Sequence, residues 1–375
     1  MKKKIVSALL CVAMIATMVT GCGGSKSSST SGNADSTAKQ FEINAAIAAN
    51  PPALDPHTVN ANVTGAIGIH IYEALFQMDE NYEPQPVLAE SYEMSDDGKE
   101  YTIKLRQGVK FHNGDEMKAD DVVASMNRWM ELSPKAKTLI GGSVFEKVDD
   151  YTVKLTVNEP SSDIIMVLAS PIQFAAIYPK SVVDSASDEG VKEYIGTGPY
   201  KVAEWKQDQY VKLEKNEDYQ PAEGKSSGLA GAKNAQADTI TFNIVTDTAT
   251  RIAGVQNGQY DIAEDIPADQ YKDLATDKNL TMDVRSGGTL NLFLNTTEGV
   301  MADEKVRQAA LAALNCDDIL MASYGDADLY KLNAGWCNPD DAQWGTEAGS
   351  EYYNQNDVEK AKKLLSESSY NNEKI

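Results

Sequence analysis

The first 22 residues constrain this chain most, because they divide a segment suited to export from the part that folds. A positive start at Lys2 to Lys4 is followed by a largely apolar run from Ile5 to Val19, and small residues then precede Cys22. Charge, apolar run and cleavage site occur here in the order of a secretory signal. The apolar run is too short to cross a bilayer comfortably. The sequence therefore predicts that the folded body lies outside the cytoplasm.

Cys22 stands in a context that resembles a bacterial lipobox. The resemblance implies a lipoprotein signal over residues 1–22, acylation of Cys22 and attachment to a membrane. An ordinary signal peptide with a coincidental cysteine is the alternative. Residues 23–40 consist mainly of small and polar side chains, so we expect a flexible linker there.

Two cysteines remain once Cys11 leaves with the signal and Cys22 carries lipid. In an oxidising compartment Cys316 and Cys337 are a possible disulfide. Sequence separation does not show whether their Cα atoms approach closely enough to pair, so two independent thiols are the alternative.

Composition excludes one class of partner. The formal net charge is −22, and removal of Lys2 to Lys4 makes it more negative by three. No basic stripe remains, so nucleic acid is not an expected partner. With 42% hydrophobic residues among 375 positions, the chain has enough apolar material for two or more packed lobes.

Apolar periodicity and turn residues predict a mixture of α and β structure. Asp97-Gly98 separates two alternating runs at 89–94 and 101–106, which predicts a hairpin because this dipeptide tolerates positive φ angles. Asp120 is expected to cap the helix that follows. Further strands are expected at 41–49, 145–157, 200–205, 210–215, 240–245, 260–263, 280–285 and 290–294, and further helices at 62–76, 164–168, 248–256, 303–314 and 357–365.

Several short motifs occur in an order that resembles one protein family. The motifs are Leu54-Asp55-Pro56, Tyr72–Leu75, Pro86–Tyr92, Ser95–Gly98, Tyr101–Arg106, Gly108–Gly114, Ala119–Val122, Gly196–Tyr200 and Val306–Ala309, with Asn216, Tyr219, Arg251, Gly258 and Asp261. Their joint order resembles the extracytoplasmic family 5 solute-binding proteins of ABC transporters, the peptide- and nickel-binding family. Residues 315–317 depart from the family pattern.

The resemblance implies an α/β (mixed α+β) fold of the two-lobed, periplasmic-binding-protein-like type II. Residues 41–285 are expected to form the first lobe, with an inserted subdomain at about 73–190, and residues 286–375 the start of the second lobe. Members of the family continue beyond the position of Ile375, so we expect a truncated chain with an incomplete second lobe.

The same resemblance implies that ligand is contacted by the loop after the first strand, partly through backbone groups. In peptide-binding members, the charged groups that hold the ligand termini lie largely in the C-terminal part. The candidate ligand contacts are Asn50, Pro51, Pro52 and Ala53, with Tyr200 and Asn291 as weaker candidates.

Gly287 and Gly288 lie between two predicted strands where the pattern changes, so they are hinge candidates. An ordinary turn is the alternative. Hinged lobes that close over a ligand hide it from water and convert binding into a change of shape.

Enzyme motifs are not found in the sequence. The three histidines lack zinc-type spacing, and no Gly-x-Ser-x-Gly elbow occurs. Gly224-Lys225-Ser226 ends like a phosphate loop, but Tyr219 stands where the first glycine is required. The carboxylate pairs at 96–97 and 120–121 are interpreted as parts of a turn and a helix start. We therefore expect no catalytic site, metal or cofactor.

The function that the resemblance implies is a substrate-binding lipoprotein of an ABC importer. It would capture di- or oligopeptides outside the cell, as a monomer, and deliver them to permease subunits by hinged closure. A protein of the same class that binds an oligosaccharide or chelated nickel is one alternative. A peptide-sensing signalling lipoprotein is another.

Overall fold

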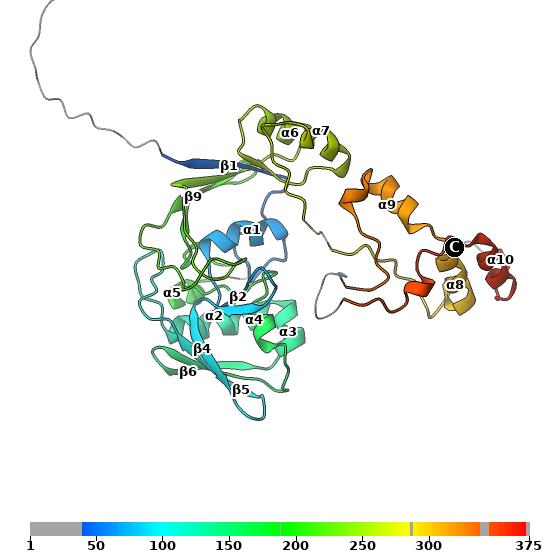
Figure 1. Ribbon diagram of the computed structural model, residues 1–375. Coiled ribbons are helices and arrows are strands. Elements are labelled where there is room, and N and C mark those ends of the chain that lie inside the picture. Colours follow the sequence, from blue (N-terminus) through cyan, green and yellow to red (C-terminus); the bar gives the residue numbers. More distant parts are fainter. Residues whose placement is uncertain (1–39, 188, 286–287, 338–344, 373–375) are drawn as a thin grey trace, which may run out of the picture. The chain divides into compact units, whose positions relative to one another are not determined.

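The computed structural model describes residues 40–187, 189–285, 288–337 and 345–372 (Figure 1). The predicted signal and lipobox at 1–22 lie outside the described residues, together with nearly all of the predicted linker and Gly287. Within the described residues, no helix combines the length and the apolar character that a membrane crossing requires.

A five-stranded sheet of mixed direction has the strand order β11-β1-β10-β9-β8. β1 (Glu42–Ile47) runs parallel to both of its neighbours, β10 (Thr239–Ile244) and β11 (Ile262–Ala263). β9 (Tyr210–Lys215) and β8 (Tyr200–Lys206) are paired antiparallel to the strands beside them. Five of the predicted strands are thus confirmed, although β11 is only two residues long.

A second sheet is antiparallel and has the order β4-β5-β7-β6. The predicted hairpin is confirmed, because Gly98 adopts a φ of 70° between the first two strands of this sheet. α2 (Ala119–Leu132) lies against the last two, and its apolar stripe, which includes Trp129, is buried. The strands are β4 (Ala89–Met94), β5 (Glu100–Leu105), β6 (Val144–Asp149) and β7 (Thr152–Thr156).

The predicted helices at 164–168, 248–256, 303–314 and 357–365 are confirmed, and the one at 62–76 ends at Ile71. Several short elements were not expected from the sequence. The other described elements are α1 (Asn62–Ile71), β2 (Phe76–Met78), β3 (Pro84–Pro86), α3 (Pro134–Ile140), α4 (Ile164–Leu168), α5 (Lys180–Asp184), α6 (Thr248–Gln256), α7 (Tyr271–Ala275), α8 (Glu304–Ala313), α9 (Cys316–Tyr324) and α10 (Val358–Ser366). Short 3-10 turns lie at Ala268–Gln270, Val300–Ala302, Ala327–Leu329 and Ser350–Tyr352.

Two large apolar clusters fill the part of the chain that contains the sheets. Residues between 75 and 177 form one cluster around α2 and the antiparallel sheet, and residues between 45 and 242 form the other around the mixed sheet. The segment 174–178 contributes alternate side chains to the two clusters, with Ala175 and Ile177 in the first and Tyr178 in the second. The expected domain boundaries, including the insertion at about 73–190, stay a prediction.

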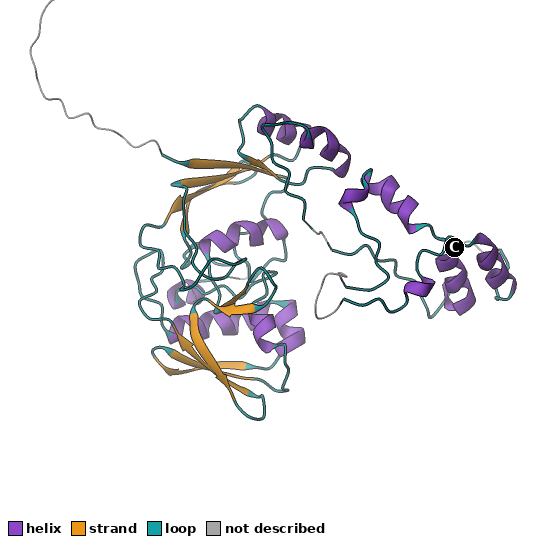
Figure 2. Ribbon diagram, viewed as in Figure 1, coloured by secondary structure: helices purple, strands orange, loops and turns teal. Residues whose placement is uncertain are grey.

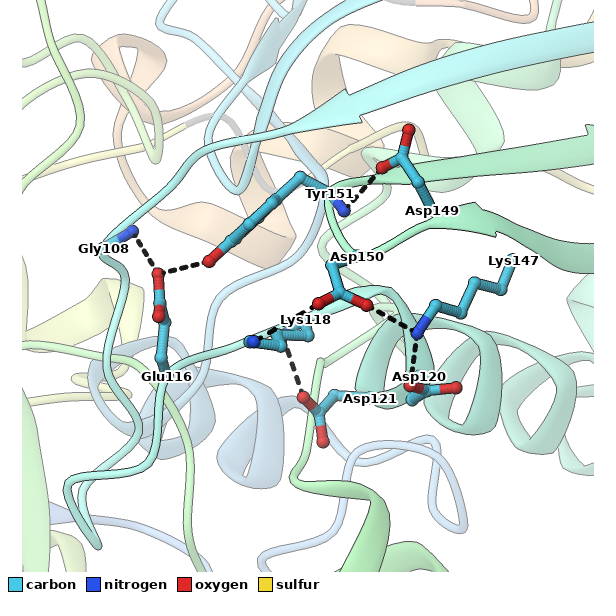
Figure 3. Close-up of polar contacts among 9 residues, drawn as sticks. All are labelled: Gly108, Glu116, Lys118, Asp120, Asp121, Lys147, Asp149, Asp150 and Tyr151. Carbon is cyan, nitrogen blue, oxygen red and sulfur yellow. Dashed lines mark hydrogen bonds and ion pairs between the residues drawn. The ribbon is translucent and has the colours of Figure 1, made fainter.

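Polar contacts hold the start of α2 and correct one prediction (Figure 3). Asp120 does not cap this helix, because Lys118 is the N-cap residue and its N–H donates to Asp121 Oδ2 at 2.9 Å. Asp120 instead accepts from Lys147 Nζ at 2.8 Å, and the same ammonium donates to Asp150 Oδ1 at 2.8 Å. These carboxylates fix one turn of helix to the β6–β7 turn, so their role is structural.

Candidate ligand-binding site

The carboxyl ends of three parallel strands meet at one edge of the mixed sheet. β11, β1 and β10 are neighbours and parallel, so the residues after Ile47, Ile244 and Ala263 leave the sheet on the same side. Open sheets that contain parallel strands bind ligands in the crevice outside these carboxyl ends. The edge formed by residues 48–53, 245–247 and 264–265 is called the strand-end edge below.

The loop after β1 contributes the candidates expected from the sequence. Pro51 is buried, Pro52 is exposed and Ala53 is half-buried. The carbonyl of Ala53 accepts the Thr64 hydroxyl at 2.6 Å, which ties the loop to α1. Asn50 Oδ1 is buried and has no hydrogen-bond partner in the described part of the chain. A buried polar atom without a partner is uncommon, which distinguishes Asn50 from the other residues of this loop.

Arg251 fixes the other two loops of the strand-end edge. This α6 residue is 2% exposed, and its guanidinium donates to backbone carbonyls rather than to a carboxylate. Nη1 donates to the carbonyls of Val245 at 2.8 Å and Thr246 at 3.1 Å. Nε and Nη2 donate to those of Glu264 at 3.0 Å and Asp265 at 2.9 Å. The sequence identified Arg251 only as part of a motif, and its role as a clip between two loops depends on the fold.

Glu264 gives the strand-end edge its acidic character. Its Oε1 accepts the Ala48 N–H at 3.1 Å, and the side chain is half-buried. Burial raises the pKa of Glu264, while the hydrogen bond from Ala48 opposes that rise. The neighbouring Asp265 is exposed and adopts a φ of 53°, a left-handed conformation unusual for a residue with a side chain. Because the donors of Arg251 are already bonded to backbone carbonyls and the Thr248 hydroxyl, this side chain offers no free donor at the edge. The carboxyl groups of Glu264 and Asp265 are hydrogen-bond acceptors when they are ionised.

Sequence reasoning did not select Glu264 or Asp265 as ligand candidates. Their signal is positional, since both directly follow the short run at 260–263 that was predicted as a strand. A carboxylate after such a strand becomes significant only when the strand is parallel to its neighbour, and pairing is not visible in the sequence.

Tyr200 does not lie at the strand-end edge. It begins β8, which is separated from β1 by two strands, and it is 5% exposed. Its hydroxyl donates to the Ala237 carbonyl at 3.1 Å, and its ring meets His70 edge to face. In this structure Tyr200 is a core residue, and its expected contact with ligand stays a prediction.

The strands expected at 280–285 and 290–294 are not formed. The structure describes both runs as loop, and no backbone hydrogen bond pairs them with another described segment (Figure 2). An alternating run becomes a strand only when a second backbone lies beside it. Asn291 is exposed, and its Nδ2 donates to Thr289 Oγ1 at 2.8 Å.

The hinge glycines and the cysteines are the remaining residues that the sequence selected. Gly288 has a φ of 107° with open space around it, and its predicted hinge partner Gly287 lies outside the described residues. Cys22 also lies outside them. Cys316 and Cys337 are free thiols and half-buried in this structure, and whether they pair stays a prediction.

All three histidines are used inside the fold. His57 Nε2 lies 3.0 Å from the Ala176 carbonyl, and His112 Nε2 lies 3.0 Å from the Gly198 carbonyl. Burial lowers the pKa of His57 to about 3 and those of His70 and His112 to about 4. Within the residues that the structure describes, no group of three or more His, Cys, Asp and Glu side chains is arranged to hold a metal ion.

Comparison with known proteins gives several relatives along most of the chain. The glutathione-binding protein GsiB of Salmonella typhimurium is 33% identical over 340 residues, which are 88% of this chain and 62% of that protein. A probable peptide ABC transporter periplasmic-binding protein of Sinorhizobium fredii is 29% identical over the same length. The chain thus spans a little under two thirds of the length of these relatives.

Solved structures show the same fold. The ABC transporter substrate-binding protein CtaP of Listeria monocytogenes matches with a TM-score of 0.71 and 27% identity, over 89% of this chain and 66% of that one. DppA of Helicobacter pylori, in complex with the peptide STSA, matches with a TM-score of 0.66, 25% identity, and 88% and 66% coverage. The expected mixed, two-lobed type of fold is confirmed by these likenesses.

A family model assigns the chain directly. Residues 83–375 match the model described as "Bacterial extracellular solute-binding proteins, family 5 Middle". This match includes the whole antiparallel sheet, α2 and most of the mixed sheet. The chain belongs to the family 5 bacterial extracellular solute-binding proteins.

Proposed function

We propose that this chain is the substrate-binding lipoprotein of an ABC importer and that it captures small peptides outside the cell. The family match over residues 83–375 carries the proposal, because the family consists of extracellular solute-binding proteins. Capture by such a protein is reversible binding and involves no covalent step.

The choice of a peptide rests on relatives and on the strand-end edge. One set of relatives consists of glutathione-binding proteins, and a solved neighbour contains a peptide. The edge presents Glu264 and Asp265, whose carboxyl groups are hydrogen-bond acceptors when they are ionised. An α-ammonium group donates three hydrogen bonds and carries positive charge, so it complements this edge.

A non-peptide solute is the second candidate. AgaA of Agrobacterium tumefaciens R10, in complex with agropinic acid, matches with a TM-score of 0.69 and 27% identity, over 87% of this chain and 64% of that one. The fold is therefore compatible with ligands other than peptides. Oligosaccharide and chelated nickel remain further alternatives within the same class.

Isothermal titration calorimetry and native mass spectrometry test the ligand class. The purified full-length protein would be titrated with glutathione, trialanine and agropinic acid, with Glu264→Gln as the variant of the edge. We expect binding of a peptide, weakened in the variant because a charge-assisted hydrogen bond contributes about 1.5–3 kcal/mol. Recovery of a sugar or agropinic acid with no peptide would contradict the peptide assignment.

Anchoring through Cys22 is part of the proposal. The lipobox-like context supports it, and the polar residues 23–40 would hold the folded body away from the membrane. Cys22→Ala is expected to abolish labelling by a palmitate analogue and to release the protein from the membrane fraction. Unchanged labelling of the variant would remove the anchor from the proposal.

Delivery to permease subunits by hinged closure completes the proposed function. The protein would act as a monomer, with the hinge at Gly287 and Gly288. Deletion of the gene should abolish uptake of a radiolabelled peptide that the purified protein binds. Normal uptake combined with a lost transcriptional response to the peptide would favour a signalling lipoprotein instead.

A further inference from the structure

Asp55 occupies a closed network of hydrogen bonds directly after the candidate ligand loop. The residue is 1% exposed. Oδ2 accepts from Arg128 Nη2 at 2.7 Å and from the Val191 N–H at 3.0 Å. Oδ1 accepts from the Tyr178 hydroxyl at 2.8 Å and from the His57 N–H at 3.1 Å. One carboxylate therefore joins its own loop to α2, to the segment 174–178 that contributes to both apolar clusters, and to the chain after α5.

The charges within this network are balanced. Burial would raise the pKa of Asp55, but hydrogen bonds from Arg128 and Tyr178, with the adjacent positive charge, hold it below its usual value. Arg128 Nη1 also lies 3.0 Å from His57 Nδ1, and burial lowers the pKa of this imidazole to about 3. At neutral pH the network therefore contains one carboxylate, one guanidinium and a neutral imidazole. A buried pair of this kind is stable only when its remaining polar groups are also bonded.

The chain between this network and Asn50 has little freedom. Two prolines follow Asn50 and restrict φ to a narrow range. The Ala53 carbonyl is held by Thr64, and Leu54 is fully buried. The loop therefore has few ways to change its conformation independently, so a displacement of Asp55 should also move Asn50.

We propose that Asp55 is a positioning residue, which holds the loop Asn50–Ala53 at the strand-end edge and connects its position to α2 through Arg128. Asp55 does not touch ligand in this proposal. The consequence for binding rests on the proposed function, because it requires the loop to be part of the ligand site. The anchoring itself does not.

Glu73 provides a matched control. It is also fully buried, and it accepts the hydroxyls of Thr197 at 2.9 Å and Tyr219 at 2.8 Å. Lys233 Nζ lies 3.6 Å from its Oε1. Among the described residues, none of these three partners hydrogen-bonds to residues 48–53. Loss of this carboxylate should therefore lower stability without releasing the ligand loop.

Hydrogen–deuterium exchange tests the anchor without any ligand. Residues 48–54 would be followed in the wild type, Tyr178→Phe, the charge-neutral pair Asp55→Asn/Arg128→Gln, and Glu73→Gln, at a temperature where circular dichroism shows each to be folded. We expect exchange about tenfold faster in the double variant, a smaller increase in Tyr178→Phe, and no increase in Glu73→Gln. If the double variant does not fold, Tyr178→Phe decides.

Two results would overturn the anchor: unchanged exchange at residues 48–54 in the folded Asp55-network variants, or an equal increase in Glu73→Gln. Calorimetry with glutathione and trialanine then adds the functional readout. The Kd should rise about tenfold in the double variant and remain within about twofold in Glu73→Gln, even where the latter has the lower Tm. If the wild type binds neither probe, the peptide assignment fails, while the exchange result still decides the anchor.

Discussion

Two regions of the described chain differ in what they bury. The region from β1 to α7 contains fully buried aromatic side chains such as Trp129 and Tyr178. In the region from 288 to 372, the main apolar cluster is built from three buried alanines with two partly buried leucines, where α8 meets α10. Larger side chains there, including Phe293 and Trp336, are mostly exposed. Because stabilisation follows the apolar area removed from water, the first region should be much the more resistant to unfolding.

The largest expected effect comes from replacing a buried tryptophan, compared with the same replacement of an exposed one. Trp129 is fully buried and its Nε1 donates to the Gln173 carbonyl at 2.7 Å, whereas Trp336 is 64% exposed. Trp129→Ala should lower the free energy of unfolding by about 3–5 kcal/mol through lost burial and a cavity. Trp336→Ala should change it by less than about 0.5 kcal/mol. Urea titrations followed by far-ultraviolet circular dichroism measure both, and similar losses would break the comparison.

Acid should weaken the first region more than the second. His57, His70 and His112 all lie in the first region, and their folded-state pKa values of about 3, 4 and 4 are below the unfolded value of 6.5. The unfolded chain therefore takes up protons first as pH falls. With respect to these three histidines, the free energy of unfolding is highest above pH 6.5. It falls towards pH 4 with a slope of up to about 1.4 kcal/mol per pH unit for each histidine.

A variant of one histidine sharpens this measurement. His70 packs between the rings of Tyr200 and Phe242, so His70→Phe keeps an aromatic ring there and removes one titrating group. Urea titrations from pH 7 to 4 should show a slope smaller by about one proton than in the wild type. An unchanged slope would mean that His70 is not the neutral, buried group that the structure describes.

The smallest effect concerns the contact between α8 and α10. Asp303 caps α8 by accepting the Lys305 N–H and also accepts the N–H and hydroxyl of Ser369, and these hydrogen bonds lower its pKa to about 2. The stability that these hydrogen bonds give to the folded state is fully present above the unfolded pKa of 3.8 and is lost as pH falls through about 2. Asp303→Ala should speed amide exchange in residues 358–369 by a few fold at neutral pH, with no change in α2. Equal acceleration in α2 would show that the two regions unfold together.

Local features of the sequence predicted local structure well. The hairpin at Gly98 and the limits of α6 depend on residues that are neighbours in the chain, so turn and periodicity rules apply directly. Asp120 was misassigned because the N-cap of α2 lies two residues earlier, at Lys118, whose N–H donates to Asp121. Cap assignment from sequence is uncertain by this margin.

Long-range partners account for what the sequence missed. Nothing near Glu42 indicates that it pairs with Thr239, and nothing near Asp55 indicates Arg128 as its partner. The run at 290–294 alternates as a strand should, but no described backbone lies beside it. Part of the candidate site, the loop at 50–53, was predicted through family resemblance. Glu264 was not, because its position depends on parallel pairing between β1 and β11.

The clip made by Arg251 has a consequence for how such a protein can diversify. Apart from one hydrogen bond to the Thr248 hydroxyl, its donors bind backbone oxygens of Val245, Thr246, Glu264 and Asp265, and a carbonyl is present whichever side chain a residue carries. Substitutions at these four positions can therefore alter what the edge offers to a solute while the path of both loops is retained. A contact of this type separates the path of the two loops from the chemistry of their side chains, so the ligand preference of the edge can change without rebuilding the fold.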